Sequence, residues 1–273
     1  MDETASLQSA FVQKHRRHHR FVTLCRILGF VLFLGLWETS ARLDWIDSFI
    51  FSSPGGIAST LLGMGRDGSL FRHTWITLYE TLVSFGLVIL ISFGAATLLW
   101  LSGTLSEILE PWLVILNSLP KSALAPLLIV WLGSGPRTII VAGISVAVFG
   151  SIISMYTAFR ETDAGKIKLI RTLGGGRGHI LGKVVFPSSL PSVISLLKVN
   201  IGLCLVGVII GEFLAAREGL GYLIIYSSQV FRLNYLIAAL MILCVIALGL
   251  YTAIQKLEHL IRKRRKLLFT GSL

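Results

Sequence analysis

The sequence predicts an all-α polytopic membrane protein with six transmembrane helices, and three observations lead to that prediction. Of its 273 residues, 54% are hydrophobic and only 14% are charged, whereas about a quarter of a soluble domain is charged. The mean hydropathy is +0.78. The apolar residues fall into runs of about 20, which is the length that a helix needs to cross a hydrocarbon core of about 30 Å.

Six runs satisfy this length, and the third of them is interrupted by prolines. The expected spans are residues 22–40, 74–101, 108–132, 137–158, 190–214 and 234–256. Because Pro111, Pro120 and Pro126 each remove a backbone donor, the third helix is expected to be broken or kinked. Such a break survives in a bilayer where protein or water binds the freed carbonyls. Asn117 and Ser118, beside Pro120, are therefore candidates to line a solute pathway.

Basic residues predict how the spans are oriented. Six spans place both ends of the chain on one side of the membrane. Sixteen of the 25 Lys and Arg residues lie in the two ends and in the segment between the fourth and fifth spans, and six lie in the opposite loops. The positive-inside rule then places both termini in the cytoplasm. The expected organisation is a basic tail over 1–21, a six-helix transmembrane domain over 22–257 with a cytoplasmic loop at 159–188, and a second basic tail over 258–273.

The loop between the fourth and fifth spans is expected to hold a helix of its own. Asp163 is a good N-cap and Gly174 is a good C-terminal cap. Between them apolar residues recur at every third position from Ala164 to Leu173 and form one stripe. A helix of about ten residues is marginal in water, so this one is expected to dock on something. The chain then turns, and a second short helix is expected to end at Pro187, which gives the loop a helix–turn–helix shape that fits a partner's cleft.

Several classes of function are disfavoured by what the sequence lacks. The net charge of +11 is clustered as a topology signal would be, so it does not indicate nucleic-acid binding. The basic segment around Lys183 lacks the phosphate-loop pattern, because Val184 follows that lysine where a Ser or Thr is required. The cysteines lie in apolar runs without metal spacing, and no catalytic constellation is present. We therefore expect neither an enzyme nor a resident metal.

Gly174, nine further residues and then VVFP (residues 184–187) form the first of four stretches that carry a resemblance. This stretch is similar to the second half of the EAA loop of the permease subunits of bacterial ABC importers, and the resemblance extends over most of the chain, from about Phe51 to Tyr251. The other three stretches are SSPGGI near Pro54, LPKSALAPLLIVWLGSG (residues 119–135) and GEFLAAREGLGYLI (residues 211–224). They are similar to the branch that imports nitrate, sulfonates, taurine and thiamine-precursor pyrimidines.

The resemblance implies a type I importer fold in the bacterial inner membrane and a set of partners. These are a second permease subunit, most simply a copy of this chain, an ABC ATPase subunit that binds ATP and Mg²⁺, and an extracytoplasmic substrate-binding protein. No cofactor is implied for the chain itself. The residues implied to couple to the ATPase are Asp163, Lys168, Arg171, Thr172, Leu173, Gly174, Gly175 and Pro187. The sequence departs from the family where EAA is expected, because it reads Lys168-Leu169-Ile170 and so places a base where the family has an acid.

Three ionisable residues within the expected spans are candidates for the solute path: Glu80, Lys198 and Glu212. Charged groups at membrane depth are costly and usually line a cavity or find a partner. The alternative for each is a structural ion pair or a side chain that extends to the interface. Related proteins usually carry an arginine at the position of Glu80.

The two acids favour import of a neutral or cationic solute, such as a thiamine-precursor pyrimidine, since they raise the barrier for an anion. Neutralisation of either acid by Arg72, Arg217 or Arg232 would cancel this argument. Import of an anion such as nitrate, a sulfonate or taurine is therefore the alternative. A self-contained secondary transporter is more remote, because neither internal repeats nor coupling-ion carboxylates are evident.

Overall fold

A computed structural model describes residues 2–270, with side chains over 21–261. The described residues form helices and turns without a β-strand, which confirms the all-α prediction. The helices are α1 (Asp2–Arg42), α2 (Ser48–Phe51), α3 (Pro54–Arg66), α4 (Ser69–Leu101), α5 (Gly103–Ser118), α6 (Lys121–Leu132), α7 (Pro136–Arg160), α8 (Ala164–Thr172), α9 (Arg177–Ile180), a π-helical turn (Leu181–Val185), α10 (Phe186–Ala215), α11 (Leu220–Gln229) and α12 (Leu233–Thr270).

Within the described residues, five stretches of helix are long and apolar enough to cross a membrane. They are Phe21–Arg42, Ser69–Leu101, Pro136–Arg160, Arg177–Ala215 and Leu233–Ile261. The expected third span is broken as its prolines predicted, because α5 and α6 meet at an angle of 95° on either side of Leu119 and Pro120. Pro111 and Pro126 remain inside helices, so the residue between two helix ends, Pro120, is the one that marks the break.

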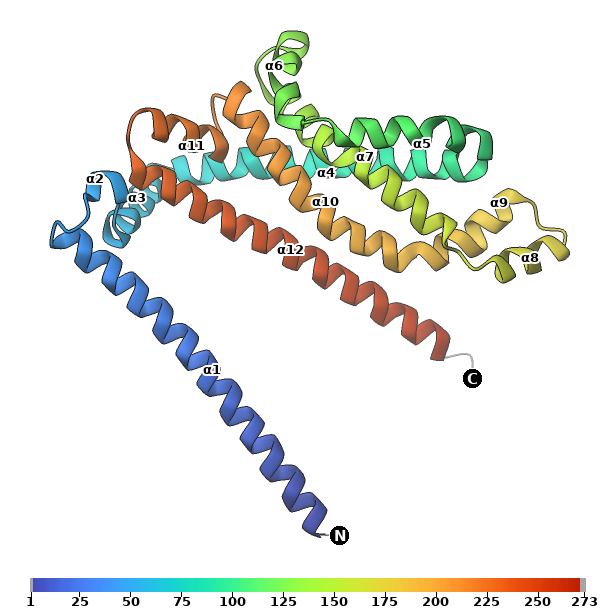
Figure 1. Ribbon diagram of the computed structural model, residues 1–273, viewed down its shortest axis with the longest axis horizontal. Helices are drawn as coiled ribbons and strands as arrows, with labels where there is room; N and C mark the ends of the chain where they lie inside the picture. Colours follow the sequence, from blue (N-terminus) through green and yellow to red (C-terminus); the bar gives the residue numbers. More distant parts are fainter. Residues whose placement is uncertain (1, 271–273) are drawn as a thin grey trace.

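The core of the bundle is the contact of α4, α7 and α10, which lie side by side in Figure 1. Small residues allow this approach, since a Cβ on Gly207 of α10 would lie 2.8 Å from the Cα of Gly143 of α7. A buried hydrogen bond crosses the same contact, from Asn200 Nδ2 to Ser151 Oγ at 2.8 Å. Close backbone approach and a satisfied polar pair therefore hold the two central helices together.

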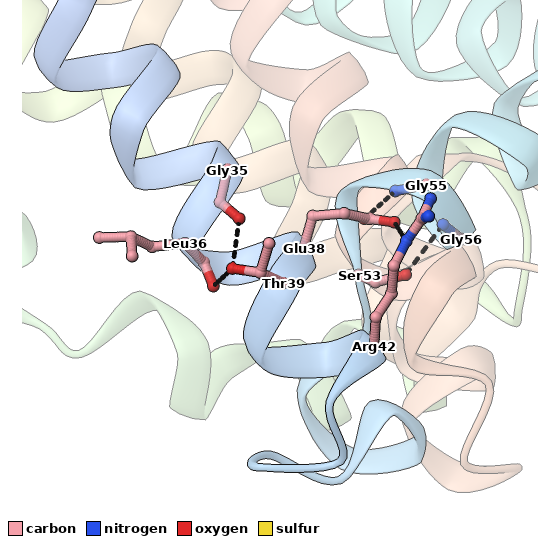
Figure 2. Close-up of polar contacts among 8 residues, drawn as sticks. All are labelled: Gly35, Leu36, Glu38, Thr39, Arg42, Ser53, Gly55 and Gly56. Atoms are coloured by element: carbon pink, nitrogen blue, oxygen red, sulfur yellow. Dashed lines mark hydrogen bonds and ion pairs between the residues drawn. The ribbon is translucent and has the colours of Figure 1, made fainter.

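The first helix lies apart from this bundle (Figure 1), and within Phe21–Arg42 the one buried residue is Ala41, near the end of the helix. Its last turns are anchored by Glu38, which accepts hydrogen bonds from the Gly55 backbone N–H and from Arg42 Nε, both at 2.8 Å. Ser53 caps α3 beside this contact by accepting from the Gly56 N–H at 3.0 Å (Figure 2). The contact fixes where α1 joins the bundle, while most side chains over residues 21–36 are exposed.

The expectation that a short helix ends at Pro187 is wrong. The chain runs from α9 through the π-helical turn into α10, with Pro187 in the first turn of α10. A proline ring inside a continuous helix clashes with the carbonyl four residues earlier. The wider turn, in which the Phe186 N–H donates to the Leu181 carbonyl, is placed directly before Pro187 and gives its ring room.

Candidate functional site

The loop after α7 forms a capped helix at one end of the bundle, α8 (Figure 1). Asp163 Oδ1 accepts from the backbone N–H groups of Gly165 at 2.7 Å and Lys166 at 3.4 Å, as expected of an N-cap. Gly174 ends the helix with φ +80°, a left-handed conformation that glycine adopts without strain. The Gly175 N–H then donates to the Ile170 carbonyl at 2.9 Å. Both predicted caps are confirmed.

The residues of the predicted apolar stripe of α8 do not all face the same side. Some pack on the bundle and others face away from it. Ile167 and Ile170 are half-buried and pack against the bundle's own core. Leu173, together with Leu169, points away from the bundle, and these side chains are 74% and 60% exposed. The helix therefore docks on its own chain through the isoleucines and presents two leucines outward.

Most of the predicted coupling residues lie together on this element. Lys168, Arg171 and Thr172 are exposed on α8, and the Thr172 hydroxyl donates to the Lys168 carbonyl at 3.0 Å. The segment is tied back to the bundle by Arg177, whose Nη1 donates to the Leu101 carbonyl at the end of α4 at 2.8 Å. Pro187 lies beyond α9, in α10, and is not part of the α8 surface.

A second cluster lies at the opposite end of the bundle, where α4, α10 and α11 meet (Figure 1). Glu212 of α10 is fully buried. Its carboxylate accepts hydrogen bonds from the Thr77 hydroxyl of α4 at 2.7 Å, from the Gly221 N–H of α11 at 2.5 Å and from the Tyr222 N–H. Thr77 Oγ1 in turn accepts from the Leu220 N–H at 2.8 Å. One carboxylate thus fixes the start of α11 to two long helices.

The glycines of the same stretch make room for this carboxylate. Gly219 has φ +113° and ψ 165°, a conformation open to glycine alone. A Cβ there would lie 2.5 Å from the Glu212 carboxyl carbon, and a Cβ on Gly221 would lie 2.8 Å from Glu212 Oε2. The residues Thr77, Gly219 and Gly221 escaped the sequence analysis as partners of Glu212, although the glycine spacing in GEFLAAREGLGYLI was visible.

Glu80 lies one turn after Thr77 on α4, with 1% of its surface exposed. Its carboxyl group is within hydrogen-bonding reach of the Glu212 carboxyl, and no donor among the described residues reaches its Oε2. Glu80 also lines a cavity of about 450 Å³ between α4, the start of α7 and the α10–α11 loop. The structure therefore brings two of the predicted path residues, Glu80 and Glu212, into one cluster.

Arginine does not neutralise this pair in the described part of the chain. Arg72 forms its ion pair with Glu218, and Arg232 lies over the ring of Tyr235, 5.8 Å from its centroid. Arg217 lines the cavity without an ion pair to either acid among the residues described.

Lys198 lies elsewhere on α10 and forms an ion pair with Glu258 of α12. Both side chains are largely covered, at 21% and 10% exposed. The structure therefore shows Lys198 in a structural ion pair, which was the alternative to a role in the solute path. Sequence reasoning missed the partner because Glu258 was assigned to the start of the C-terminal tail.

The break between α5 and α6 brings a further cation into the bundle. Asn117 packs over Gly150 of α7, where a Cβ would lie 3.2 Å from its Oδ1, and Ser118 Oγ donates to the Val114 carbonyl at 2.9 Å. Lys121 Nζ donates to the free Leu116 carbonyl at the end of α5 and lies 5.2 Å from the centroid of the Phe149 ring. Sequence analysis missed Lys121, and its place directly after the helix-breaking Pro120 was the available signal.

A groove of about 560 Å³ runs between α7 and α10 on the half of the bundle that carries α8. Its polar lining consists of Ser154, Thr157, Glu161, Ser192 and Ser195. The remaining lining residues are apolar, so the groove contains one acid and no base. Hydroxyl groups beside apolar surface suit a small polar solute.

Comparison with known proteins assigns the chain to a family. Residues 88–265 match the family described as binding-protein-dependent transport system inner membrane component. A probable ABC transporter permease protein of Haemophilus influenzae is 33% identical over 235 residues, which cover 85% of this chain and 94% of that protein.

Two further relatives carry the names of solutes. The formylaminopyrimidine transport permease protein ThiX of Halalkalibacterium halodurans is 27% identical and covers 88% of this chain and 95% of its own length. The putative aliphatic sulfonates transport permease protein SsuC of Bacillus subtilis is 24% identical, covering 93% of this chain and 92% of its own length.

The fold is found in a solved ABC transporter. The inward-facing MetNI methionine transporter contains a chain that superposes with a TM-score of 0.65 at 20% identity, over 72% of this chain and 98% of that one. The family is a membrane transport component and not an enzyme. The chain belongs to the binding-protein-dependent transport system inner membrane components, and it is a type I ABC importer permease.

Proposed function

We propose that two copies of this chain form the translocation path of an importer for a small neutral or cationic solute. Each copy docks through α8 on a cytoplasmic ABC ATPase that binds ATP and Mg²⁺. An extracytoplasmic binding protein delivers the solute to the outer face, and both termini lie in the cytoplasm. The observation that carries the proposal is α8, which exposes Leu169 and Leu173 outside the apolar spans.

The coupling part rests on the build of α8. Exposed leucines on a water-facing helix mark an interaction surface, and the isoleucines of α8 pack the opposite side of the helix against the core of the bundle. The segment that follows α8 contacts the end of α4 through Arg177 of α9 and continues through the π-helical turn into α10. Movement of a bound ATPase would therefore be transmitted to the helices that line the groove.

The solute part rests on the groove between α7 and α10. Its single charged lining residue is Glu161, and its other polar groups are hydroxyls. An anion would meet repulsion there, whereas a neutral or cationic heterocycle would find hydrogen-bonding partners. The 27% identical relative named for formylaminopyrimidine transport supports the same solute class.

One observation favours an anion as the second candidate. Lys121 places a cation at the helix break, and among the described residues no carboxylate pairs with it. A desolvated sulfonate or similar group is well met by such a lysine, and one relative is named for aliphatic sulfonates. The two candidates differ in which charged residue, Glu161 or Lys121, the solute passes.

Uptake into proteoliposomes that contain the permease, its ATPase and its binding protein decides between them. We expect saturable, ATP-dependent import of a formylaminopyrimidine, with taurine, alkyl sulfonate and nitrate at background. Lys121→Met should leave that import unchanged, and Glu161→Gln should reduce it. Import of an anion alone, lost in Lys121→Met, would establish the second candidate. Solute uptake without any ATPase would contradict the proposed function as a whole.

A further inference from the structure

The carboxyl groups of Glu80 and Glu212 face each other in the interior of the bundle. Both residues are at most 1% exposed, and their carboxyl groups lie within hydrogen-bonding reach. Two ionised carboxylates cannot form a hydrogen bond, because neither supplies a donor. Buried like charges at such a distance also repel strongly in a low-dielectric interior. A proton between them resolves both problems.

We propose that Glu80 and Glu212 form a proton-binding site, in which Glu80 is a neutral acid that donates its hydrogen bond to the Glu212 carboxylate. The assignment of the proton follows from the surrounding donors. Glu212 receives hydrogen bonds from the Thr77 hydroxyl and from the Gly221 and Tyr222 N–H groups, all of which favour its ionised form.

Glu80 has the opposite environment. Its Oε2 is buried, and no group in the described part of the chain donates to it, so an ionised Glu80 would leave a desolvated charge without compensation. Protonation removes that charge and supplies the missing donor toward Glu212. The proton comes from water, and the site requires no other ligand.

The remaining titratable groups around the pair are engaged with other partners or lie across the cavity. On α4, Arg72 pairs with Glu218 and His73 Nδ1 accepts from the Gly219 N–H at 3.0 Å. The cavity beside Glu80 is also lined by Tyr79 and by Arg217 and Glu218 of the α10–α11 loop, while α11 contributes Tyr222, stacked on the His73 ring. The start of α7 adds no charged group to the lining of this cavity. None of these contacts supplies a counter-charge to Glu80.

Two consequences follow for the molecule. The pair carries one negative charge per subunit in place of two, so it repels an anion less than two separate acids would. The proton also joins α4 to the α10–α11 junction, so its loss at high pH should weaken that junction. Because the folded chain then holds one more proton than the unfolded chain does at neutral pH, its stability must fall as pH rises.

Infrared difference spectroscopy on the purified full-length permease in lipid nanodiscs tests the proton directly. At neutral pH we expect a protonated-carboxyl C=O band in the wild type that is lost in Glu80→Gln. Glu218→Gln is the matched control, since Glu218 lines the same cavity but is paired with Arg72, and it should keep the band. A band that persists in Glu80→Gln, or that is absent from the wild type, would overturn the proposal.

Thermal unfolding over about pH 6 to pH 9 gives a second readout. The wild-type Tm should fall by at least about 3 °C across this range, and the Glu80→Gln profile should be flatter by that amount. Glu212→Gln should lower Tm at every pH, because its amide N–H₂ would face the donors that Glu212 accepts from. If the Tm of Glu80→Gln falls with pH as steeply as that of the wild type, the site is not as proposed. The same holds if Glu212→Gln abolishes the dependence of Tm on pH without lowering Tm at neutral pH.

Discussion

The two ends of the bundle differ in whether their functional side chains are buried. At one end they are enclosed by the chain itself, and at the other they are exposed. At the α11 end, Glu212 is enclosed by donors from α4 and α11, and the glycines around it leave no spare volume. At the α8 end, Leu169 and Leu173 lie exposed, and Lys168 forms no ion pair among the described residues. One end is closed within a single chain, whereas the other is the surface that we propose a partner covers.

The largest effect is expected from filling the closed end. Gly221→Val places a Cβ 2.8 Å from Glu212 Oε2, and overpacking a site that cannot relax costs about 1–3 kcal/mol or more. We expect a sharp loss of monodisperse protein and a lower Tm. Gly249→Val in α12 is the matched control, because no atom lies within 4 Å of its added Cβ. Equal yields and Tm values for the two variants would show that the closed end is not tightly packed.

The next effect concerns the turn that ends α8. Gly174 has φ +80° and open space around it, so Gly174→Val meets backbone strain of about 1–2 kcal/mol and not a clash. We expect normal amounts of protein in the membrane, with ATP hydrolysis uncoupled from uptake. Gly176→Val is the control, since Gly176 has an extended conformation, with φ −75° and ψ 175°, and also faces open space. Normal uptake by Gly174→Val would contradict the coupling role of this turn.

A closed polar contact of intermediate strength joins α10 to α12. Lys198→Met removes the basic partner from a largely covered ion pair with Glu258. We expect a loss of about 1–3 kcal/mol in the free energy of unfolding, below the value for a fully buried pair because both side chains retain some exposure. The double variant Lys198→Met/Glu258→Gln should recover most of it. A double variant no more stable than Lys198→Met would mean that the two side chains are not coupled.

The smallest effect is expected at the exposed charge of the open end. Lys168→Glu should weaken assembly with the native ATPase a few-fold, and more at low salt than at high salt, because the contact is electrostatic and solvent-exposed. Lys183→Glu, an equal charge change on an exposed residue outside α8, should leave co-purification unchanged. An unchanged yield for Lys168→Glu would place Lys168 in water, outside the interface.

The elements that depend on local sequence could be predicted, and the contacts between distant elements could not. The long apolar helices, the break at Pro120, the Asp163 cap and the left-handed Gly174 each follow from a few neighbouring residues. The bond between Thr77 and Glu212 joins residues 135 positions apart, and no periodicity within either helix indicates it. The same holds for Lys198 and Glu258, whose pairing depends on how α12 crosses α10.

The errors have equally specific causes. Pro187 was expected to end a helix because the rule for proline assumes regular α-helical geometry, and the π-helical turn before it removes the clash. The stripe of α8 was expected to form a single docking face. Instead, Ile167 and Ile170 serve the chain's own core, and Leu173 is left exposed. An apolar period indicates that a helix packs on something, but not on how many sides.

The central claim, that α8 is a surface completed by an ATPase, is tested most directly by the paired variant Leu169→Ser/Leu173→Ser. Burying one leucine contributes about 1.5–3 kcal/mol, so loss of both should weaken co-purification of the ATPase at least about tenfold. Because neither side chain packs on the bundle, the Tm of the permease alone should not change. Leu43→Ser, which alters an exposed leucine in the turn after α1, should leave both quantities as in the wild type. Full ATPase binding by the paired variant would contradict the claim.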